Sequence, residues 1–368
     1  MNSFAIFRLP HERQGTLMLQ TTGEPLQLRH PDELRHRQGF VMAPFMATSL
    51  PLLLIQPDTV TTFSSAEELL RLMDGISPLQ PPPEGGGHSA GVLCEGSLPH
   101  RREAGGDRAS YAADFARFHH ELEAGTYQKL VLSRCAEEPN TGDVTPVELF
   151  LRACRLYPRL FIALVSTPQA GTWLTATPEI LLEGDRQQWR TIALAGTMQL
   201  SGDDLNGEGE QIHWSVKNIQ EQRYVASYVA DCLKRLGIDY IETGPQTVRA
   251  AQLVHLRSDF TFALGQHVQP CDLLAALHPT PAVCGLPKDE ALRFIIGQEH
   301  SPRRYYSGYM GPLSPSATHL YVSLRCMQIE PSRYLLYAGG GILKDSSEPE
   351  EWQETESKLQ TMRSLLTP

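Results

Sequence analysis

Groups that could bind an anion through a metal ion are concentrated in one stretch, AGGGILKDSSEPEEWQETESK, residues 338–358. Its three consecutive glycines allow the backbone to approach a ligand closely and to point amides at an anion. In the acidic helix predicted after them, Glu351, Glu354 and Lys358 recur at three- and four-residue spacing and therefore share one face. Carboxylates that face an anion repel it unless a divalent cation lies between them, and Mg²⁺ binds one or two carboxylates together with substrate oxygens. The pattern indicates a site for a magnesium-bridged organic acid.

The same stretch also has a purely structural interpretation. Ser347 followed three residues later by Glu350 has the spacing of a capping box, and Pro349 suits the first turn of a helix. An acidic helix that only faces solvent would show this spacing too, with Glu354 and Lys358 forming a surface pair worth tenths of a kcal/mol. The choice between the metal-site interpretation and the solvent-exposed helix depends on whether the rest of the chain supplies further groups that could bind or react with an organic acid.

Two other residues could transfer protons. Lys129 lies in a predicted strand with apolar neighbours, where desolvation could lower its pKa enough for a base near neutrality. The alternative is an edge-strand lysine in water. Glu179 follows Thr177-Pro178 and precedes an apolar run, so its pKa could be raised and it could serve as a general acid. Its alternative is a turn residue at the start of a strand.

Charged residues elsewhere could recognise a substrate or only stabilise the fold. Arg325 stands among alternating apolar residues, either as an edge charge or as an inward fork that binds a carboxylate with two hydrogen bonds. Lys217 and Glu221 are four residues apart on a predicted helix, a spacing typical of a surface salt bridge. His255 has the surroundings of a structural histidine.

The composition is that of a globular protein, with 41% hydrophobic and 20% charged residues in 368. The net charge of −10 argues against nucleic acid and anionic membranes as main partners. No run approaches the roughly 18 apolar residues of a membrane span, and no signal-peptide pattern is present. The seven cysteines are scattered, odd in number and never in C-x-x-C spacing, which predicts free thiols in a reducing cytoplasm. We expect a cytoplasmic monomer.

Apolar periodicity predicts the elements that must position these residues. A helix is predicted from Ser65 through Met73, and residues 77–107, rich in Pro and Gly, are predicted to be a loop or linker. Strands are predicted at 4–9, 17–20, 39–43 and 52–55, and further helices near 110–124, 147–156 and 213–236. Because helices cluster between runs of strands, the pattern favours an α+β sandwich.

Eight motifs in order along residues 110–368 give the sequence a family resemblance. They are GTYQKLVLSR, TATPEILLEG, ALAGTMQ, KNIQEQ, LHPTPAVCGLP, RRYYSGYMG, SLRC and AGGGILKDSSEPEEWQETESK. Together they resemble the chorismate-utilising enzymes, and within that family most closely the isochorismate synthases. The resemblance implies a large α/β/α sandwich of mainly antiparallel sheets. It also implies a chorismate-binding catalytic domain at 108–368, with a variable N-terminal segment at 1–107 that includes the linker and packs on the same sandwich.

The resemblance also implies a role for each site residue. Lys129 takes the position of the base that activates water for attack on ring carbon 2 of chorismate, and Glu179 that of the acid that protonates the departing 4-hydroxyl. Glu221 and Glu354 match Mg²⁺ ligands, and Glu351 matches a nearby carboxylate that often reaches the metal through water. The positions that match substrate-binding groups are Gly196, Thr197, His255, Tyr306, Arg325, Gly339 and Lys358.

Two positions bear on the reaction that the resemblance implies. Aminating relatives generally lack the lysine base, so Lys129 favours water as the nucleophile. Relatives that form 4-amino-4-deoxychorismate carry a lysine where this chain has Ala195. The sequence thus predicts a Mg²⁺-dependent isochorismate synthase, of menaquinone or siderophore type. Three alternatives stay open: a salicylate synthase, which also eliminates pyruvate; an ammonia-using subunit; and a non-catalytic chorismate-binding homologue. One departure is Gln222, where the family commonly has histidine.

Overall fold

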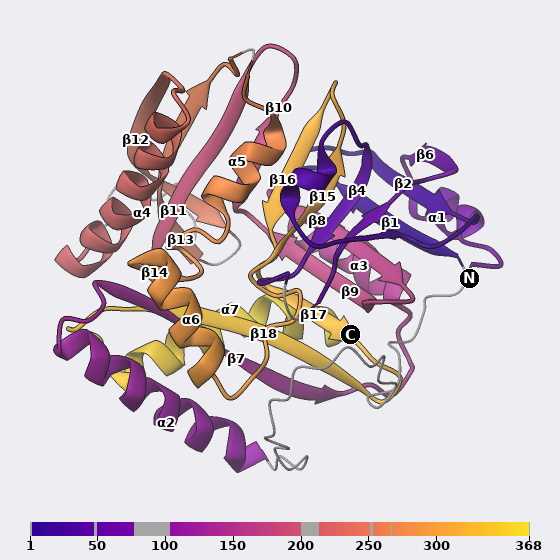
Figure 1. Ribbon diagram of the computed structural model, residues 1–368. Helices are drawn as coiled ribbons and strands as arrows, with labels where there is room; N and C mark the ends of the chain where they lie inside the picture. The colour runs from indigo at the N-terminus through magenta and orange to yellow at the C-terminus, as the bar shows by residue number, and fades with distance from the viewer. Residues whose placement is uncertain are drawn as a thin grey trace, which may run out of the picture.

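Two large antiparallel sheets form the body of the protein. The computed structural model describes residues 2–47, 50–76, 104–199, 213–250, 253–265 and 267–367. Within them the strands form two nine-stranded sheets, and every pair of neighbouring strands is antiparallel (Figure 1). The predicted α+β sandwich of antiparallel sheets is confirmed, and the two sheets face one another in its middle.

The first sheet mixes strands from both ends of the chain. Its order is β14 (Gly285–Leu286), β7 (Lys129–Pro139), β18 (Arg333–Ile342), β17 (Cys326–Ile329), β9 (Gly171–Thr177), β8 (Phe161–Thr167), β1 (Ser3–Arg8), β2 (Gly15–Gln20) and β6 (Thr59–Phe63). The glycine run of β18 therefore lies beside β7, where Gly341 pairs with Val131 and Gly339 with Ser133.

The second sheet is built in the same way. Its order is β12 (Tyr240–Ala250), β13 (Leu253–Phe262), β11 (Trp189–Gln199), β10 (Ile180–Gly184), β16 (Thr318–Val322), β15 (Tyr309–Leu313), β4 (Gly39–Ala43), β5 (Leu52–Ile55) and β3 (Leu26–Leu28). The register of β11 against β13 shifts between Ala195 and Thr197, so that Gly196 is bulged out of the ladder with φ of 70°.

The core has apolar layers on both faces of the sheets. Between the sheets lie Phe40, Phe161, Trp173 and Tyr321, and the rings of Phe161 (β8) and Tyr321 (β16) stack 4.3 Å apart. The run FIALVST of β8 is buried at every position because both of its faces are covered. Apolar helix faces close the outer layers.

The helices cover the outer faces. On the first sheet pack α2 (Ala104–Glu123), α3 (Pro146–Leu156) and α7 (Glu348–Leu366), with α6 (Lys288–Gln298) at the β14 edge. The second sheet is covered by α4 (Val216–Arg235) and α5 (Pro270–Leu277), with the short 3-10 helix η1 (Pro31–Leu34) beside α5. The helix α1 (Ala66–Leu72) lies against β6.

Most predicted elements are present close to their predicted bounds. The four N-terminal strands correspond to β1, β2, β4 and β5, and the predicted helices to α1, α2, α3 and α4. The strands β3 and β6 were not predicted, because β3 has three residues and β6 (TVTTF) is mostly exposed and carries little apolar signal. Most of the predicted linker, residues 77–103, lies outside the described residues. The division of the chain at residue 107 stays a proposal.

Two further observations concern the chain as a whole. None of the helices in the described ranges is long and apolar enough to span a membrane. The six cysteines that the structure describes carry free thiols, as the sequence predicts.

Candidate active site

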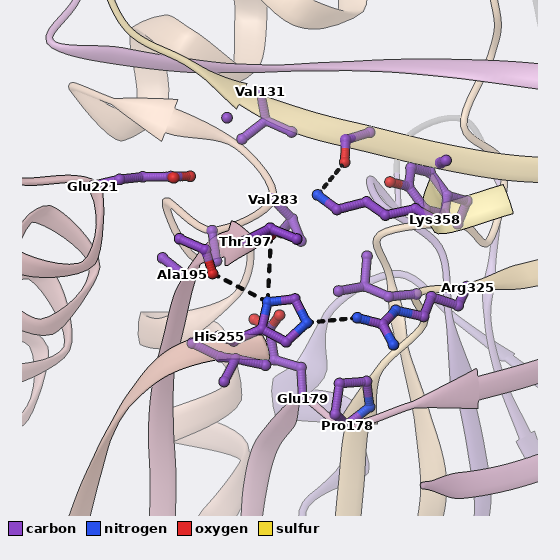
Figure 2. Close-up of a pocket in the computed structure, with 18 of the residues that line it drawn as sticks. Val131, Pro178, Glu179, Ala195, Thr197, Glu221, His255, Val283, Arg325 and Lys358 are labelled. Atoms are coloured by element: carbon purple, nitrogen blue, oxygen red, sulfur yellow. Dashed lines mark hydrogen bonds between the residues drawn. The ribbon is translucent and has the colours of Figure 1, made fainter. Parts of the chain in front are cut away.

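One pocket lies between the sheets, where β7 and β18 of the first face β11 and β13 of the second (Figure 2). Many of the predicted site residues line it: Glu179, Gly196, Thr197, Glu221, His255, Tyr306, Arg325, Gly339 and Lys358. The other three, Lys129, Glu351 and Glu354, are not in the pocket wall but lie close behind it, in contact with groups described below.

Lys129 is completely buried although it is the first residue of its strand. The strand β7 lies between β14 and β18 in the sheet. Lys129 is therefore not the water-exposed edge lysine of the alternative interpretation. Its Nζ lies 2.9 Å from Oε1 of Glu221. Burial alone would raise the pKa of Glu221, but the ammonium of Lys129, together with those of Lys358 and Lys217, outweighs this and holds that pKa below its ordinary value. Glu221 therefore faces the pocket as a carboxylate.

The glycine run explains how these groups fit. A Cβ on Gly341 would lie 2.1 Å from Oε1 of Glu221 and 2.9 Å from Cε of Lys129. A Cβ on Gly340 would lie 3.2 Å from Oε2 of Glu351 and 3.4 Å from Oε1 of Glu354. The missing side chains on β18 thus make the space in which three carboxylates converge on one strand.

We predict that Gly341→Ala lowers any catalytic turnover at this pocket about 100-fold, because the added methyl group must displace Glu221 or Lys129 and a shift of about 1 Å in a reacting site is that costly. The matched control is Gly297→Ala in α6, where an added Cβ meets nothing within 4 Å. Turnover number and melting temperature are measured for both variants. Wild-type turnover in Gly341→Ala would show that the crowding at this strand does not matter for function.

Glu351 is the most deeply buried of the three carboxylates, with a residue exposure of 1%. Its Oε1 accepts a hydrogen bond from Lys217 on α4, whereas its Oε2 has no hydrogen-bond partner. Burial and then the nearby Glu354 raise the pKa of Glu351 to about 7. The spacing of Lys217 and Glu221 predicted a surface salt bridge between them; that prediction is wrong, because Lys217 pairs with Glu351 and Glu221 with Lys129.

The start of α7 also differs from the prediction. Ser347 is the N-cap residue, but its side chain makes no capping hydrogen bond, so the predicted capping box is wrong. The preceding turn is closed by Ser346 instead, whose Oγ accepts a hydrogen bond from the backbone N–H of Leu343. One turn further on, the predicted Glu354–Lys358 pair is present at 2.7 Å, and Lys358 also donates to the carbonyl of Gly339 at 2.8 Å.

Glu179 lies between β9 and β10 and is 3% exposed. Burial raises its pKa to about 7, and the charges of Lys129, Lys358 and Arg325 oppose that rise. The carboxyl group can therefore hold or release a proton near neutrality. Glu179 and His255 both line the pocket, and both are labelled in Figure 2.

His255 connects Arg325 to the bulge of β11. Its Nε2 lies 2.6 Å from Nη2 of Arg325, and its Nδ1 lies 3.1 Å from the carbonyl of Gly196 and 3.3 Å from Oγ1 of Thr197 (Figure 2). Burial, and then the charges of Arg325 and Lys358, lower the pKa of His255 well below its ordinary value, so the ring is neutral. Because a guanidinium only donates, Nε2 must accept and Nδ1 must carry the hydrogen. The hydroxyl hydrogen of Thr197 is thereby directed away from His255.

Arg325 itself has φ of 46°, a conformation that is rare for a residue with a side chain, and is 5% exposed. Burial lowers its pKa to about 10, which leaves it charged at neutral pH. Of the two interpretations of Arg325, the inward-facing fork agrees with the structure. The edge charge does not.

Sequence reasoning missed one buried ion pair that shapes the pocket. Arg303 donates to Glu299 at 2.7 Å, to the carbonyl of Val283 at 2.6 Å and to that of Val131 at 2.8 Å. Both valines line the pocket, and Glu299 also accepts from the backbone N–H of Ser133. The motif RRYYSGYMG contained Arg303, but nothing in its spacing identified Glu299 as the partner.

The three glutamates agree with the donor set that Mg²⁺ prefers, since all supply carboxylate oxygens and Oε2 of Glu351 is buried without a partner. Their oxygens are not all within 4.8 Å of one another, however. Within the described ranges only Asp32, Cys271 and Asp272 satisfy that distance. The glutamates are the better candidates, because Asp272 is paired with Arg35 at 2.8 Å and a cysteine sulfur is a poor ligand for Mg²⁺.

Comparison with known proteins gives consistent matches. A family model described as chorismate binding enzyme matches residues 96–367. The chain is 32% identical over 250 residues to isochorismate synthase MenF of Escherichia coli (strain K12), covering 67% of this chain and 57% of the relative. It is 31% identical over 249 residues to isochorismate synthase DhbC of Bacillus subtilis (strain 168), covering 65% of this chain and 63% of the relative. The chain thus spans about three fifths of the length of the curated relatives it matches.

The structural likeness extends over nearly the whole chain. The structure of the menaquinone-specific isochorismate synthase MenF from Escherichia coli superposes with a TM-score of 0.78 at 23% identity, covering 99% of this chain and 89% of that one. At this identity the likeness concerns the fold. It includes the strands before residue 77, which the family model does not match.

Proposed function

Because the chain belongs to the family of chorismate binding enzymes, we propose that it is an isochorismate synthase, an isomerase that converts chorismate to isochorismate. The curated relatives that carry this name support the proposal. So does Ala195, which stands beside Gly196 in the pocket where a relative that forms 4-amino-4-deoxychorismate would carry a nucleophilic lysine.

One observation carries the proposal: a buried carboxyl with a pKa of about 7 faces a pocket surrounded by cations. Arg325 and Lys358 line that pocket, and the charge of Lys129 also reaches Glu179. A dianion such as chorismate would be held by Arg325 and Lys358, while Glu179 would offer a proton to a departing hydroxyl group.

The chemistry assigned to the residues is an exchange of one hydroxyl group for another. Lys129, in its uncharged amine form, would take a proton from the water that attacks ring carbon 2. Glu179 would give a proton to the 4-hydroxyl, which leaves as water while the ring double bond shifts. Substrate and product are then isomers, and no covalent intermediate with the protein is needed. Catalysis would come from positioning and from the paired acid and base.

We assign the metal site to Glu221, Glu351 and Glu354, with Mg²⁺ as the ion. When bound there, the ion would supply positive charge to a carboxylate of the substrate. The residues of this chain set the position of that charge, because Glu221 is fixed by Lys129, and Glu354 by Lys358.

The test is chromatography of the products after purified protein is incubated with chorismate and Mg²⁺. We expect isochorismate without pyruvate, no turnover in EDTA, and recovery when Mg²⁺ is added in excess, because three unneutralised carboxylates next to the pocket would repel the substrate. Full activity in the chelator would contradict the metal assignment. Salicylate with pyruvate would indicate a salicylate synthase, and ammonium-dependent product an ammonia-using subunit. No consumption of chorismate would indicate a binding module.

The cell compartment and the oligomeric state stay predictions, namely a cytoplasmic monomer. The relatives include enzymes named for menaquinone and for salicylate biosynthesis, so the proposal extends to the reaction and not to one pathway.

A further inference from the structure

Lys217 links the two helices that carry the carboxylate cluster. It lies in the first turn of α4, four residues before Glu221, and its ammonium forms an ion pair with Glu351 on α7. The side chain of Lys217 is 27% exposed, whereas that of Glu351 is 1% exposed. Burial lowers the pKa of Lys217, but the carboxylates of Glu351, Glu354 and Glu221, in that order, raise it overall. The ammonium therefore interacts with all three carboxylates.

The place of Lys217 in its own helix is unfavourable. The first turn of a helix carries the positive end of the helix dipole, which favours acidic side chains and disfavours an ammonium group. The first turn of α4 contains no acidic residue that would offset this. The pair of Lys217 with Glu351 is also not an ordinary exposed salt bridge, which is worth tenths of a kcal/mol, because Glu351 is deeply buried. The carboxylate cluster, and not the helix, accounts for a lysine at this position.

The two oxygens of Glu351 have different surroundings. Oε1 accepts the hydrogen bond of Lys217, while Oε2 has no hydrogen-bond partner and lies over Gly340 next to Oε1 of Glu354. Glu351 can thus keep its contact with Lys217 and still present one oxygen to a cation between the carboxylates. Three carboxylates with Lys129, Lys217 and Lys358 carry a formal charge of 0, and a divalent cation changes this to +2.

We propose that Lys217 is a built-in cation that shares Glu351 with the divalent metal and weakens the metal's binding to the carboxylate cluster. The proposal rests on the metal site of the proposed function. Without Lys217 the cluster has a formal charge of −1 before a divalent cation binds, so the cation meets less positive charge and should bind more tightly. Lys217 in turn allows α4 and α7 to bring their carboxylates together without excessive repulsion.

The experiment uses Mn²⁺ as the probe and follows free Mn²⁺ by electron paramagnetic resonance during titration of the 368-residue chain. We expect Lys217→Gln to bind Mn²⁺ about tenfold more tightly than wild type, because one positive charge has been removed from the carboxylate cluster. Lys234→Gln, which removes an exposed lysine from the last turn of the same helix, should bind as wild type does. Lys217→Arg keeps the charge and should also retain wild-type affinity.

A second readout does not depend on a metal titration. In EDTA, Lys217→Gln should melt at a lower temperature than Lys234→Gln, and saturating Mn²⁺ should close the gap, because a ligand that binds only the folded state stabilises it. In a Glu351→Gln background the Lys217→Gln change should alter Mn²⁺ affinity less than in wild type, since the shared carboxylate is gone.

The outcomes separate the two proposals. If wild-type protein binds no Mn²⁺ at all, the metal site of the proposed function is wrong, and this inference with it. If wild type binds Mn²⁺ and Lys217→Gln binds it equally or more weakly, the inference about Lys217 alone is overturned. If Lys217→Arg behaves like Lys217→Gln, the effect is not one of charge and the inference is likewise overturned.

Discussion

Lys129→Ala is expected to lower the turnover number with chorismate by about 10²- to 10⁴-fold, the range that a positioned proton-transfer group contributes. Lys129 is fully buried at the start of β7, and its only ion-pair partner in the described part of the chain is Glu221. An alanine there removes the amine that would take the proton from water attacking ring carbon 2.

The substrate should still bind to this variant, because Arg325 and Lys358 remain in the pocket. The turnover number is measured at saturating chorismate and Mg²⁺, and chorismate binding by calorimetry. Lys234→Ala is the control for loss of a lysine in general, and the melting temperature of each variant separates loss of function from loss of fold. Undiminished turnover in Lys129→Ala would show that another group is the base.

Elements that bury a continuous apolar face could be predicted from the sequence. The strands β1 and β8 and the helix α3 have apolar residues at the period of their element, so their type and approximate bounds follow from the pattern alone. The strand β6 could not be predicted, since it is held by pairing with β2 while most of its side chains face solvent. Such a strand is specified by its neighbour and not by its own residues.

The site could be predicted in its residue types but not in its pairs. Spacing placed Glu354 and Lys358 together correctly, because both lie on one helix four residues apart. Spacing also paired Lys217 with Glu221, and there it was wrong. Each of these residues found a partner on a different element, Glu351 on α7 and Lys129 on β7, and burial made those contacts stronger than a surface pair. Contacts between elements depend on how the two sheets and their helices pack, which local spacing does not encode.

The family resemblance adds what spacing lacks. It assigned Glu179 and Lys129 to one site although 50 positions separate them in the chain, and the structure brings them close enough for the charge of Lys129 to lower the pKa of Glu179. It did not provide the orientation of His255. That orientation follows from the contacts with Arg325 and Gly196 alone.

The second large effect is expected for Glu179→Gln, which should lower turnover by about 10²- to 10⁴-fold, because an amide cannot protonate the departing 4-hydroxyl. The amide has nearly the same shape as the carboxyl it replaces, so the fold should persist. Glu12→Gln, at an exposed position in the turn between β1 and β2, is the matched control. Turnover within about twofold of wild type in Glu179→Gln would exclude Glu179 as the essential acid.

The pH dependence of the wild type gives an independent check on Glu179. Burial raises its pKa to about 7, and an acid acts in its protonated form, so the limb of the turnover profile that Glu179 controls should fall about tenfold per pH unit above that pH. The contribution of Glu179 to the stability of the fold also decreases as pH rises. A carboxyl whose pKa is higher in the folded than in the unfolded protein binds protons preferentially in the folded state, so its contribution to stability decreases as pH rises from its ordinary value of 4.5 to about 7. Glu179→Gln should remove that part of the stability profile, as measured by melting temperature against pH, whereas Glu12→Gln should keep it. If Glu179→Gln kept the wild-type fall of the turnover number above pH 7, another group would cause that fall and Glu179 would not be the acid.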